Sequence, residues 1–455
     1  MTKHFDAIII GAGQAGPSLA GRLTQAGRKV ALIERKHVGG TCVNTGCMPT
    51  KAMVASAYAA HMAARAADYG VRIQGRPEID FSKVMARKDI VRFNARKNNE
   101  IWLEGMENCN LIRGHARFED THSISVDGAR LTADMFFINT GGRAAIPDYP
   151  GLPDIPYLTN VSLLDLDRLP AHLAIIGGSY IALEFAQMFR RFGSNVTVIE
   201  RGPRLIGHED EDVSAAVKDI LADEGIDIRL NTKSLSFSPH GGGVKIAIGD
   251  NAVEASHVLI ATGRRPNTDD LGLEKAGVEL DAKGFIGVDD RLKTNIDHIY
   301  ALGDCNGQGA FTHTSYNDFE IVAANLLDGD KRKVSERIKT YALYIDPPLG
   351  RVGMTEREAR ATGRKLLIGT RPMSRVGRAV EKGETLGFMK VIADAGTGEI
   401  LGASILGTGG DEAVQTILDV MYARRPYTMI TRAMHIHPTV SELIPTVFGD
   451  MKPTH

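Results

Sequence analysis

The chain has 455 residues, the length of about three ordinary domains. Its 54 basic and 55 acidic side chains nearly cancel, so the charge gives no sign of nucleic acid or an anionic membrane as a partner. A hydrophobic content of 43% supplies packed cores, yet no apolar run reaches the roughly 18 residues of a membrane span. The N-terminus leads directly into a strand without a signal-peptide pattern, and a cytoplasmic protein is therefore expected.

A glycine-rich turn follows the first expected strand. The apolar run over residues 6–10 leads into Gly11, Gly13 and Gly16, and a helical pattern follows. The next apolar strand ends on Glu34. Strand, glycine turn, helix, strand and terminal acid together make a dinucleotide-binding fingerprint. The glycines let the backbone approach a pyrophosphate at the helix N-terminus, and the acid can accept hydrogen bonds from ribose hydroxyls.

Two of the four cysteines, Cys42 and Cys47, stand in a run of glycine and polar residues. An alanine-rich helical segment over residues 52–67 follows, so Cys47 is expected near the positive end of a helix, where the pKa of a thiol falls. A metal site would need a second ligand pair, and neither Cys109 nor Cys305 has a partner at ligand spacing. A structural disulfide is the other alternative and is rare in cytosolic chains. The pair is therefore predicted to be redox-active.

The middle of the chain carries further helix and strand patterns. A charged, amphipathic helix is expected over residues 81–104, one strand region over residues 110–118, and an apolar strand over residues 135–140. That strand ends in Thr140 and Gly141, preceded by Asn139.

A second fingerprint begins at residue 173. An apolar strand leads into Gly177, Gly178 and Ser179, then a helix through residue 192 and a strand that ends on Glu200. Ser179 stands where the motif has its second glycine, so the approach to phosphate is tighter there. Two fingerprints imply two dinucleotides, which suits a flavin and a nicotinamide.

The choice of nicotinamide depends on the residues after this strand. Glu200 would hold the 2′-hydroxyl of NAD and repel the phosphate of NADP. Arg201 and Arg204 could instead pair with that phosphate, or simply belong to a solvated loop. NADH is favoured, and NADPH stays open.

Several of these runs resemble the class I pyridine nucleotide-disulfide oxidoreductases. Residues 39–51 resemble the family's redox-active disulfide motif, Gly-Gly-Thr-Cys-x4-Cys-x-Pro-x-Lys. Residues 437–442 resemble its His-Pro-Thr-x-Ser-Glu motif, and residues 294–304 its second flavin motif. Within the family the chain is most similar to mercuric-reductase-like flavoproteins, including the copper(II)-reducing kind, and it is also similar to dihydrolipoamide dehydrogenase.

The resemblance implies an α/β fold with two Rossmann-like dinucleotide-binding domains, for FAD and NAD(P), and a C-terminal α+β dimerisation domain. The FAD-binding domain would take residues 1–150 and 268–335, the NAD(P)-binding domain residues 151–267, and the interface domain residues 336–455. In the last of these, strands are expected over residues 342–345, 388–393 and 401–406 and a helix over residues 411–424. The protein would be a homodimer.

The same resemblance, with the two fingerprints, implies the cofactor-binding residues. For FAD they are Gly11, Gly13, Ala15, Gly16, Glu34, Gly40, Thr41, Thr140, Gly141, Gly303, Asp304, Thr312 and His313. For NAD(P) they are Gly177, Ser179, Tyr180, Ile181, Glu200, Arg201 and Gly263. Capping or packing is the alternative role for His313.

The implied catalytic residues are Cys42, Cys47, Lys51, Glu184, His437 and Glu442. Electrons would pass from NAD(P)H through the flavin to the cysteine pair, with Cys47 nearer the flavin and Cys42 attacking the acceptor. Lys51, paired with Glu184, would tune the flavin. The histidine of the second subunit, oriented by its glutamate, would move the proton, because a thiol that leaves a disulfide needs a donor with a pKa near neutrality.

The sequence does not decide between several electron acceptors. Thr45, Thr50 and Ser179 are typical of mercuric reductases, but the chain lacks their C-terminal cysteine pair and keeps His437. Hg(II), Cu(II), lipoamide, a glutathione-type disulfide and a quinone are all candidates. Three other possibilities are dihydrolipoamide dehydrogenase or another specific disulfide reductase, an NADH oxidase or quinone reductase, and a non-catalytic redox-sensing flavoprotein. No resident metal is expected.

Overall fold

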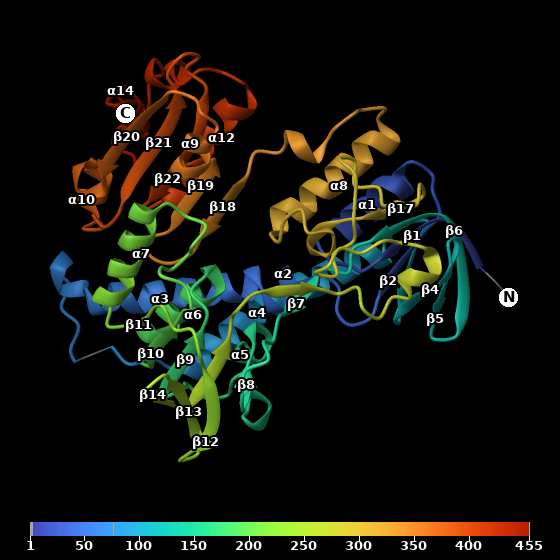
Figure 1. Ribbon diagram of the computed structural model, residues 1–455, viewed down its shortest axis with the longest axis horizontal. Coiled ribbons are helices and arrows are strands. Elements are labelled where there is room, and N and C mark those ends of the chain that lie inside the picture. Colours follow the sequence, from blue (N-terminus) through green and yellow to red (C-terminus); the bar gives the residue numbers. More distant parts are fainter. Residues whose placement is uncertain (1–2, 76, 455) are drawn as a thin grey trace.

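Three large sheets, two with parallel cores and one antiparallel, organise the chain in the computed structural model, which describes residues 3–75 and 77–454 (Figure 1). Helices cover both parallel sheets, and the antiparallel sheet belongs to the C-terminal part of the chain. The predicted class, α/β with two Rossmann-like units and a C-terminal α+β unit, is confirmed. None of the helices in the described ranges is both long and apolar enough to cross a bilayer.

The first sheet has the order β3-β2-β1-β6-β5-β4, with β17 also paired to β6. Its strands are β1 (Lys3–Ile10), β2 (Val30–Glu34), β3 (Cys109–Arg113), β4 (Ala116–Asp120), β5 (Ser123–Val126), β6 (Ala129–Ile138) and β17 (Ile299–Ala301). Successive residues of β1 enter different cores, with Ile8 on one face and Ile9 on the other. Because both faces are covered, the strand is a continuous apolar run rather than an alternating one. The single strand expected over residues 110–118 is two strands, separated by Gly114 at φ +149°.

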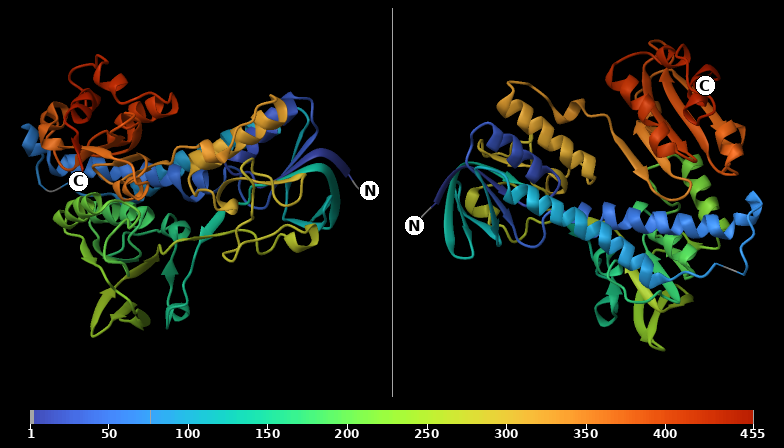
Figure 2. Two further views of the ribbon diagram at one scale, coloured as in Figure 1. Left: turned by 45° about the horizontal axis from the view of Figure 1, so that its top comes forward. Right: turned by 180° about the vertical axis from the view of Figure 1, so that it is seen from behind.

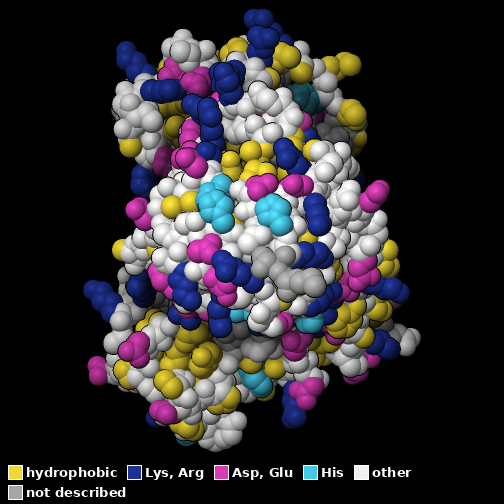
Figure 3. All heavy atoms as spheres, turned by 90° about the vertical axis from the view of Figure 1, so that its right-hand side faces the viewer, with side chains coloured by type: hydrophobic (Ala, Val, Ile, Leu, Met, Phe, Trp, Pro, Cys, Tyr) yellow, Lys and Arg dark blue, Asp and Glu magenta, His cyan; other side chains and the backbone are white. Residues whose placement is uncertain are grey.

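The helices α1 (Ala15–Gln25) and α8 (Thr312–Leu327) pack together on one face of this sheet. Both begin at the end of the sheet where the parallel strands finish, which is where ligands bind in open α/β folds. On the side of the molecule nearest the N-terminus, basic and acidic side chains are interspersed (Figure 3), in keeping with the balanced composition.

The second sheet is entirely parallel, in the order β11-β10-β9-β15-β8. Its strands are β8 (Tyr157–Leu158), β9 (His172–Ile176), β10 (Asn195–Ile199), β11 (Asp227–Arg229) and β15 (His257–Ile260). The helices on it are α5 (Asn160–Leu163), α6 (Tyr180–Phe192) and α7 (Glu211–Asp223). A separate antiparallel sheet is formed by β12 (Ser236–His240), β13 (Gly243–Ile248) and β14 (Asn251–Ala255), and β7 (Gly142–Ala144) pairs with β16 (Arg264–Pro266) between the two large sheets.

Three helices connect the two parallel sheets: α2 (Gly40–Thr45), α3 (Cys47–Ala64) and α4 (Phe81–Glu104). In Figure 2 the two long ones, α3 and α4 (blue and light blue), run from the first sheet toward the second. The bounds of α4 agree with the sequence prediction, whereas α3 begins five residues earlier than the alanine-rich segment suggested, at Cys47 itself. Phe81 at the start of α4 packs against Phe189 and Phe192 of α6, with ring centroids 6.0 and 6.1 Å apart.

The C-terminal sheet has the order β18-β19-β22-β21-β20-β23 and is antiparallel. Its strands are β18 (Thr340–Leu343), β19 (Leu349–Gly353), β20 (Leu366–Pro372), β21 (Phe388–Asp394), β22 (Ile400–Leu406) and β23 (Lys452–Pro453). Its helices are α9 (Glu356–Ala361), α10 (Gly377–Glu381), α11 (Gly410–Ala413), α12 (Gln415–Tyr422), α13 (Thr428–Thr431) and α14 (Ile444–Gly449). The single helix expected over residues 411–424 is therefore two. The first of the two, α11, begins directly against β19: a Cβ on Gly350 of β19 would lie 2.5 Å from the Gly410 carbonyl oxygen.

A buried cluster of charges joins the start of α7 to the C-terminal sheet. Arg351 of β19 pairs with Glu209, and each side chain is only 1% exposed. Nearby, Lys390 of β21 lies 2.8 Å from Asp212 and 2.7 Å from Glu356. Each buried charge thus has an opposite charge at contact distance, as burial requires.

Candidate active site

One cavity of about 2200 Å³ collects residues from the first sheet, α3, α6, α8 and β18. The predicted site residues that line it are Gly11, Gly13, Glu34, Gly40, Thr41, Cys42, Cys47, Lys51, Thr140, Gly141, Ser179, Tyr180, Ile181, Glu184, Asp304, Thr312 and His313. Those outside its lining are Ala15, Gly16, Gly177, Glu200, Arg201, Gly263, Gly303, His437 and Glu442. Segments far apart in the sequence therefore meet at one site.

The first glycine turn is shaped by a close backbone approach. Gly11 has φ +107°, and a Cβ there would lie 2.3 Å from the carbonyl oxygen of Asn139. The Asn139 side chain donates a hydrogen bond to the Gly11 carbonyl oxygen (Nδ2–O 3.1 Å), which fixes the turn. Gln14 precedes α1 without capping it, and the first turn holds no acid, so the helix N-terminus can receive an anionic group.

Two further observations show that this end of the cavity fits FAD. The Glu34 carboxylate accepts hydrogen bonds from the backbone N–H of Ala12 (2.9 Å) and of Lys36 (2.7 Å), so it is held at the cavity wall at the end of β2. Thr140 Oγ1 is buried without a hydrogen-bond partner in the described part of the chain. A buried hydroxyl without a partner is costly, and a bound polar ligand would supply one.

The second glycine turn repeats the first. Gly177 has φ +118°, and a Cβ there would lie 2.4 Å from the Ala261 carbonyl oxygen, just as Gly11 faces Asn139. Ser179 has φ −103°, a conformation open to any residue. The serine that departs from the motif is therefore accommodated without backbone strain. Ser179 is the N-cap residue of α6, and its side chain makes no capping hydrogen bond.

A smaller cavity of about 330 Å³ lies beside this turn, lined by Ser179, Glu200 and Arg204 among others. The Glu200 carboxylate accepts a hydrogen bond from the Gly202 N–H (2.7 Å) and lines this cavity. Arg204 is paired with Glu211 (Nη1–Oε1 2.9 Å), and Arg201 is exposed and lines neither cavity.

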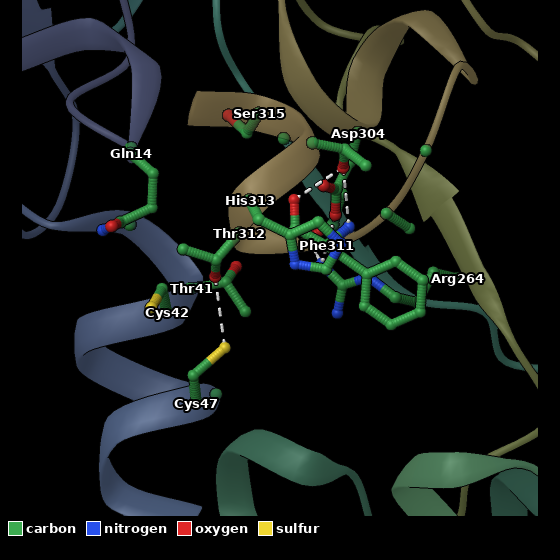
Figure 4. Close-up of a pocket in the computed structure, with 18 of the residues that line it drawn as sticks. Gln14, Thr41, Cys42, Cys47, Arg264, Asp304, Phe311, Thr312, His313 and Ser315 are labelled. Carbon is green, nitrogen blue, oxygen red and sulfur yellow. Dashed lines mark hydrogen bonds and ion pairs between the residues drawn. The ribbon is translucent and has the colours of Figure 1, made fainter. Parts of the chain in front are cut away.

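Cys42 lies in α2, and Cys47 is the first residue of α3. In Figure 4 the Cys47 sulfur points toward the Thr312 hydroxyl, with Sγ and Oγ1 3.2 Å apart. The hydrogen bond from the Cys42 thiol, together with Thr312 and Lys51, lowers the pKa of Cys47 to about 6, although partial removal from water acts to raise it. The same hydrogen bond and burial raise the pKa of Cys42 far above its ordinary value. At neutral pH the reduced pair is therefore one thiolate, at Cys47, and one thiol, at Cys42.

The lysine next to the cysteines has the partner expected from the sequence. Lys51 Nζ lies 2.6 Å from Glu184 Oε2, and the glutamate side chain is only 4% exposed. The other oxygen of Glu184 accepts a hydrogen bond from the Tyr344 N–H (3.0 Å), and the Tyr344 ring centroid lies 4.5 Å from Lys51 Nζ. Tyr344 comes from the C-terminal part of the chain, and no sequence motif around it predicts its contact with Lys51 and Glu184.

Asp304 and His313 complete the wall of the cavity. Asp304 lies 3.1 Å from Arg264 Nη2, and the same nitrogen donates to the Gly142 carbonyl oxygen (2.6 Å). His313 Nε2 is hydrogen-bonded to the Thr340 carbonyl oxygen (2.8 Å), and burial lowers its pKa. His313 thus contacts β18, in keeping with the packing role, and it also lines the cavity; its role in binding FAD stays a prediction.

The predicted histidine–glutamate pair is also formed. His437 Nδ1 lies 2.8 Å from Glu442 Oε2, with the histidine side chain 79% exposed and the glutamate 15% exposed. The neighbouring Met434 and Ile436 are exposed as well. Neither member of the pair lines the cavity that holds the cysteines of its own chain.

Within residues 3–75 and 77–454, no three or more His, Cys, Asp or Glu side chains are grouped as a metal site. In these ranges the two cysteines therefore have no third side chain of this kind grouped with them.

Family comparison agrees with this geometry. The family model for pyridine nucleotide-disulphide oxidoreductases matches residues 5–318, and the model for the dimerisation domain of the same family matches residues 340–448. The chain therefore belongs to the pyridine nucleotide-disulfide oxidoreductases, as its motifs predicted. Enzymes of this family are FAD-dependent and use NAD(P)H, and the dimerisation domain indicates a homodimer.

Individual members of the family are similar to this chain over most of its length. The probable pyridine nucleotide-disulfide oxidoreductase RclA of Escherichia coli is 37% identical, with 99% of this chain and 100% of RclA covered. The mercuric reductase of Staphylococcus aureus is 34% identical over 90% of this chain and 76% of that protein. The Cu(II) complex of RclA, an HOCl-induced flavoprotein disulfide reductase, superposes with a TM-score of 0.91 at 36% identity, covering 99% of each chain. The function expected from the sequence, electron transfer from NAD(P)H through FAD to a disulfide or a metal ion, agrees with these relatives.

The pKa of Cys47 can be measured in Cys42→Ser protein, where the serine hydroxyl keeps the hydrogen-bond donor. Burial raises the pKa of Cys109 to about 11 and that of Cys305 to about 12, so Cys47 is the reactive thiol. Because the thiolate is the nucleophile, its alkylation rate by iodoacetamide should rise through pH of about 6 and then level off. Thr312→Val should move the inflection to higher pH. An inflection in the ordinary range of a free cysteine in both proteins would contradict the assignment.

Proposed function

We propose that the protein passes electrons from NADH, through Cys42 and Cys47, to a soft metal ion, with Cu(II) as the first candidate and Hg(II) as the second. The observation that carries the proposal is the pair itself: a thiolate and a thiol at the wall of a large cavity, with no third ligand grouped beside them among the described residues. Such a site binds a soft ion and can also let it leave. The Cu(II) complex of RclA supports this choice.

Oxidation of the cysteine pair to a disulfide releases two electrons, and each of two copper ions takes one of them. The Cys47 thiolate and the Cys42 thiol form a disulfide, two Cu(II) become two Cu(I), and one proton leaves from Cys42. When bound, FAD supplies the two-electron chemistry that returns the disulfide to the dithiol at the expense of NADH. Thr312 stabilises the thiolate by its hydrogen bond, and the Lys51 ammonium, held in place by Glu184, attracts it.

FAD would be held by the residues predicted from the sequence. The α1 N-terminus would receive its pyrophosphate, Glu34 its ribose, and Thr140 and Asp304 would bond its polar groups. The FAD-binding domain would take residues 1–150 and 268–335, the NAD(P)-binding domain residues 151–267, and the interface domain residues 336–455. The protein would act in the cytoplasm, where NADH is supplied.

A second candidate acceptor is a small disulfide, because the His437–Glu442 pair is intact. An exposed imidazole oriented by a carboxylate can protonate a leaving thiolate, which a metal ion does not require. The pair lies outside its own chain's cavity, so we infer that it completes the site of the second subunit in a homodimer.

The acceptor is tested by anaerobic turnover of the holoenzyme with NADH and, in turn, Cu(II), Hg(II), lipoamide, glutathione disulfide and a quinone. We expect turnover with Cu(II) or Hg(II) that falls at least a hundredfold in Cys42→Ser, since that variant cannot form the disulfide. Fast turnover of one disulfide, with slow metal reduction, would establish the second candidate instead. Quinone turnover that survives Cys42→Ser would overturn both.

The preference for NADH is tested at Glu200. Glu200→Ala removes the acceptor of the ribose hydroxyl and the repulsion toward a 2′-phosphate. The ratio of kcat/KM for NADPH to that for NADH should therefore rise at least tenfold, since a hydrogen bond to a charged group contributes about 1.5–3 kcal/mol and roughly 1.4 kcal/mol corresponds to a factor of ten. Asp219→Ala, which removes an exposed acid of α7 outside both cavities, is the control and should change neither kcat nor KM for NADH. An unchanged ratio in Glu200→Ala would show that the carboxylate does not contact the ribose.

The role of His437 in the second subunit is tested by mixing two defective proteins. Cys42→Ser and His437→Ala homodimers should each reduce a disulfide acceptor slowly. After dissociation and reassociation, a mixed dimer contains one site with both cysteines and the histidine of the other subunit. Random mixing should therefore restore about one quarter of the wild-type activity. No recovery, despite mixed dimers shown by mass spectrometry, would contradict a role across the dimer interface.

A further inference from the structure

A stack of aromatic rings forms one wall of the large cavity. The Phe311 ring lies parallel to those of His313 (centroids 5.3 Å apart, interplanar angle 10°) and Tyr341 (5.7 Å, 2°). Its centroid is also 5.4 Å from that of Tyr180, at an interplanar angle of 41°. All four rings line the cavity, and Figure 4 shows Phe311 and His313 at its edge. Phe311 therefore links Tyr180, the first residue of α6, to Tyr341 of β18.

Tyr341 is held at its other end by buried charges. Its hydroxyl donates a hydrogen bond to Glu209, and Glu209 is bound by Arg351, whose Nε lies 3.1 Å from Oε2. Burial and the Glu209 carboxylate hold the pKa of Tyr341 far above its ordinary value, so the hydroxyl stays a donor. Since Glu209 and Arg351 are each 1% exposed, the carboxylate cannot turn to water without losing its charge partner.

The segment that carries Glu209 also borders the smaller cavity. Ile206 and His208 line both cavities, and the Glu209 N–H donates to the Ile206 carbonyl oxygen (2.8 Å). Glu209 thus contacts the loop that lines the smaller cavity through its backbone and the aromatic stack through its side chain.

We propose that Tyr341 is a positioning residue for the nicotinamide coenzyme, acting through Phe311 on Tyr180. Fixed by Glu209, Tyr341 keeps Phe311 in one orientation, and Phe311 supports the Tyr180 ring at the wall that receives the nicotinamide end of NAD(P)H. A wall ordered in advance loses less conformational freedom when a ligand binds. The inference rests on the proposed coenzyme site beside α6.

The test uses Tyr341→Phe holoenzyme, which keeps the ring and loses only the hydroxyl. We expect NAD+ binding to the oxidised enzyme, measured by calorimetry, to weaken about fivefold, the effect of one net hydrogen bond. The KM for NADH should rise similarly, while kcat stays within about twofold. In a Phe311→Leu background the stack is already broken, so Tyr341→Phe should have no further effect on binding.

The matched control is Tyr58→Phe. Tyr58 also donates to a carboxylate, Glu384 (OH–Oε1 2.6 Å), but it lies outside both cavities. This variant should bind NAD+ as the wild type does, even where its thermal stability falls.

Three results would overturn the inference. They are wild-type binding in Tyr341→Phe, equal weakening in Tyr58→Phe, and the same weakening with Phe311 present or replaced by leucine. The last would mean that Tyr341 contacts the ligand itself. Failure of the wild-type enzyme to bind either NAD+ or NADP+ would instead overturn the proposed coenzyme site.

Discussion

The close backbone approach at two glycine turns is the constraint on which the rest of the structure depends. At Gly11 and Gly177 a Cβ would lie 2.3 and 2.4 Å from the carbonyl oxygen of a neighbouring strand's end, so no side chain fits there. This approach brings the N-termini of α1 and α6 to the ends of their strands. The two helices can then present unpaired N–H groups to two dinucleotides, and the cysteine pair, on α2 and α3, lies between them at the wall of one cavity.

The cysteine pair is controlled by residues from several parts of the chain. Thr312 comes from the start of α8, Lys51 from one turn into α3, and Glu184 from α6. Tyr344 then ties Glu184 to the C-terminal sheet. The thiolate at Cys47 is therefore a product of the assembled fold as well as of its place at a helix N-terminus. The same assembly leaves His437 exposed on the surface of its own subunit, paired with the largely covered Glu442.

Local spacing predicted the parts of this site that are local. The glycine turns, the cysteine pair, Glu34 and Glu200 were all found because each depends on a short pattern with a physical meaning. The Lys51–Glu184 and His437–Glu442 pairs, implied by the family resemblance, are formed in the structure. Phe311, Tyr341, Tyr344 and Arg264 were missed, because they reach the cavity through tertiary packing of distant segments. The expected strand divides at Gly114 and the expected helix at Val414, and periodicity reveals neither of these local interruptions.

The unequal pKa values of Cys42 and Cys47 have a consequence for the driving force of the enzyme. Above pH of about 6 the reduced pair carries a single proton, so its oxidation releases one proton for two electrons. The midpoint potential of the pair then falls by about 30 mV per pH unit, against about 59 mV when both thiols are protonated. NADH oxidation also releases one proton for two electrons, so its potential has the same slope. The energy gap between coenzyme and disulfide therefore stays nearly constant as the surrounding pH rises above that point.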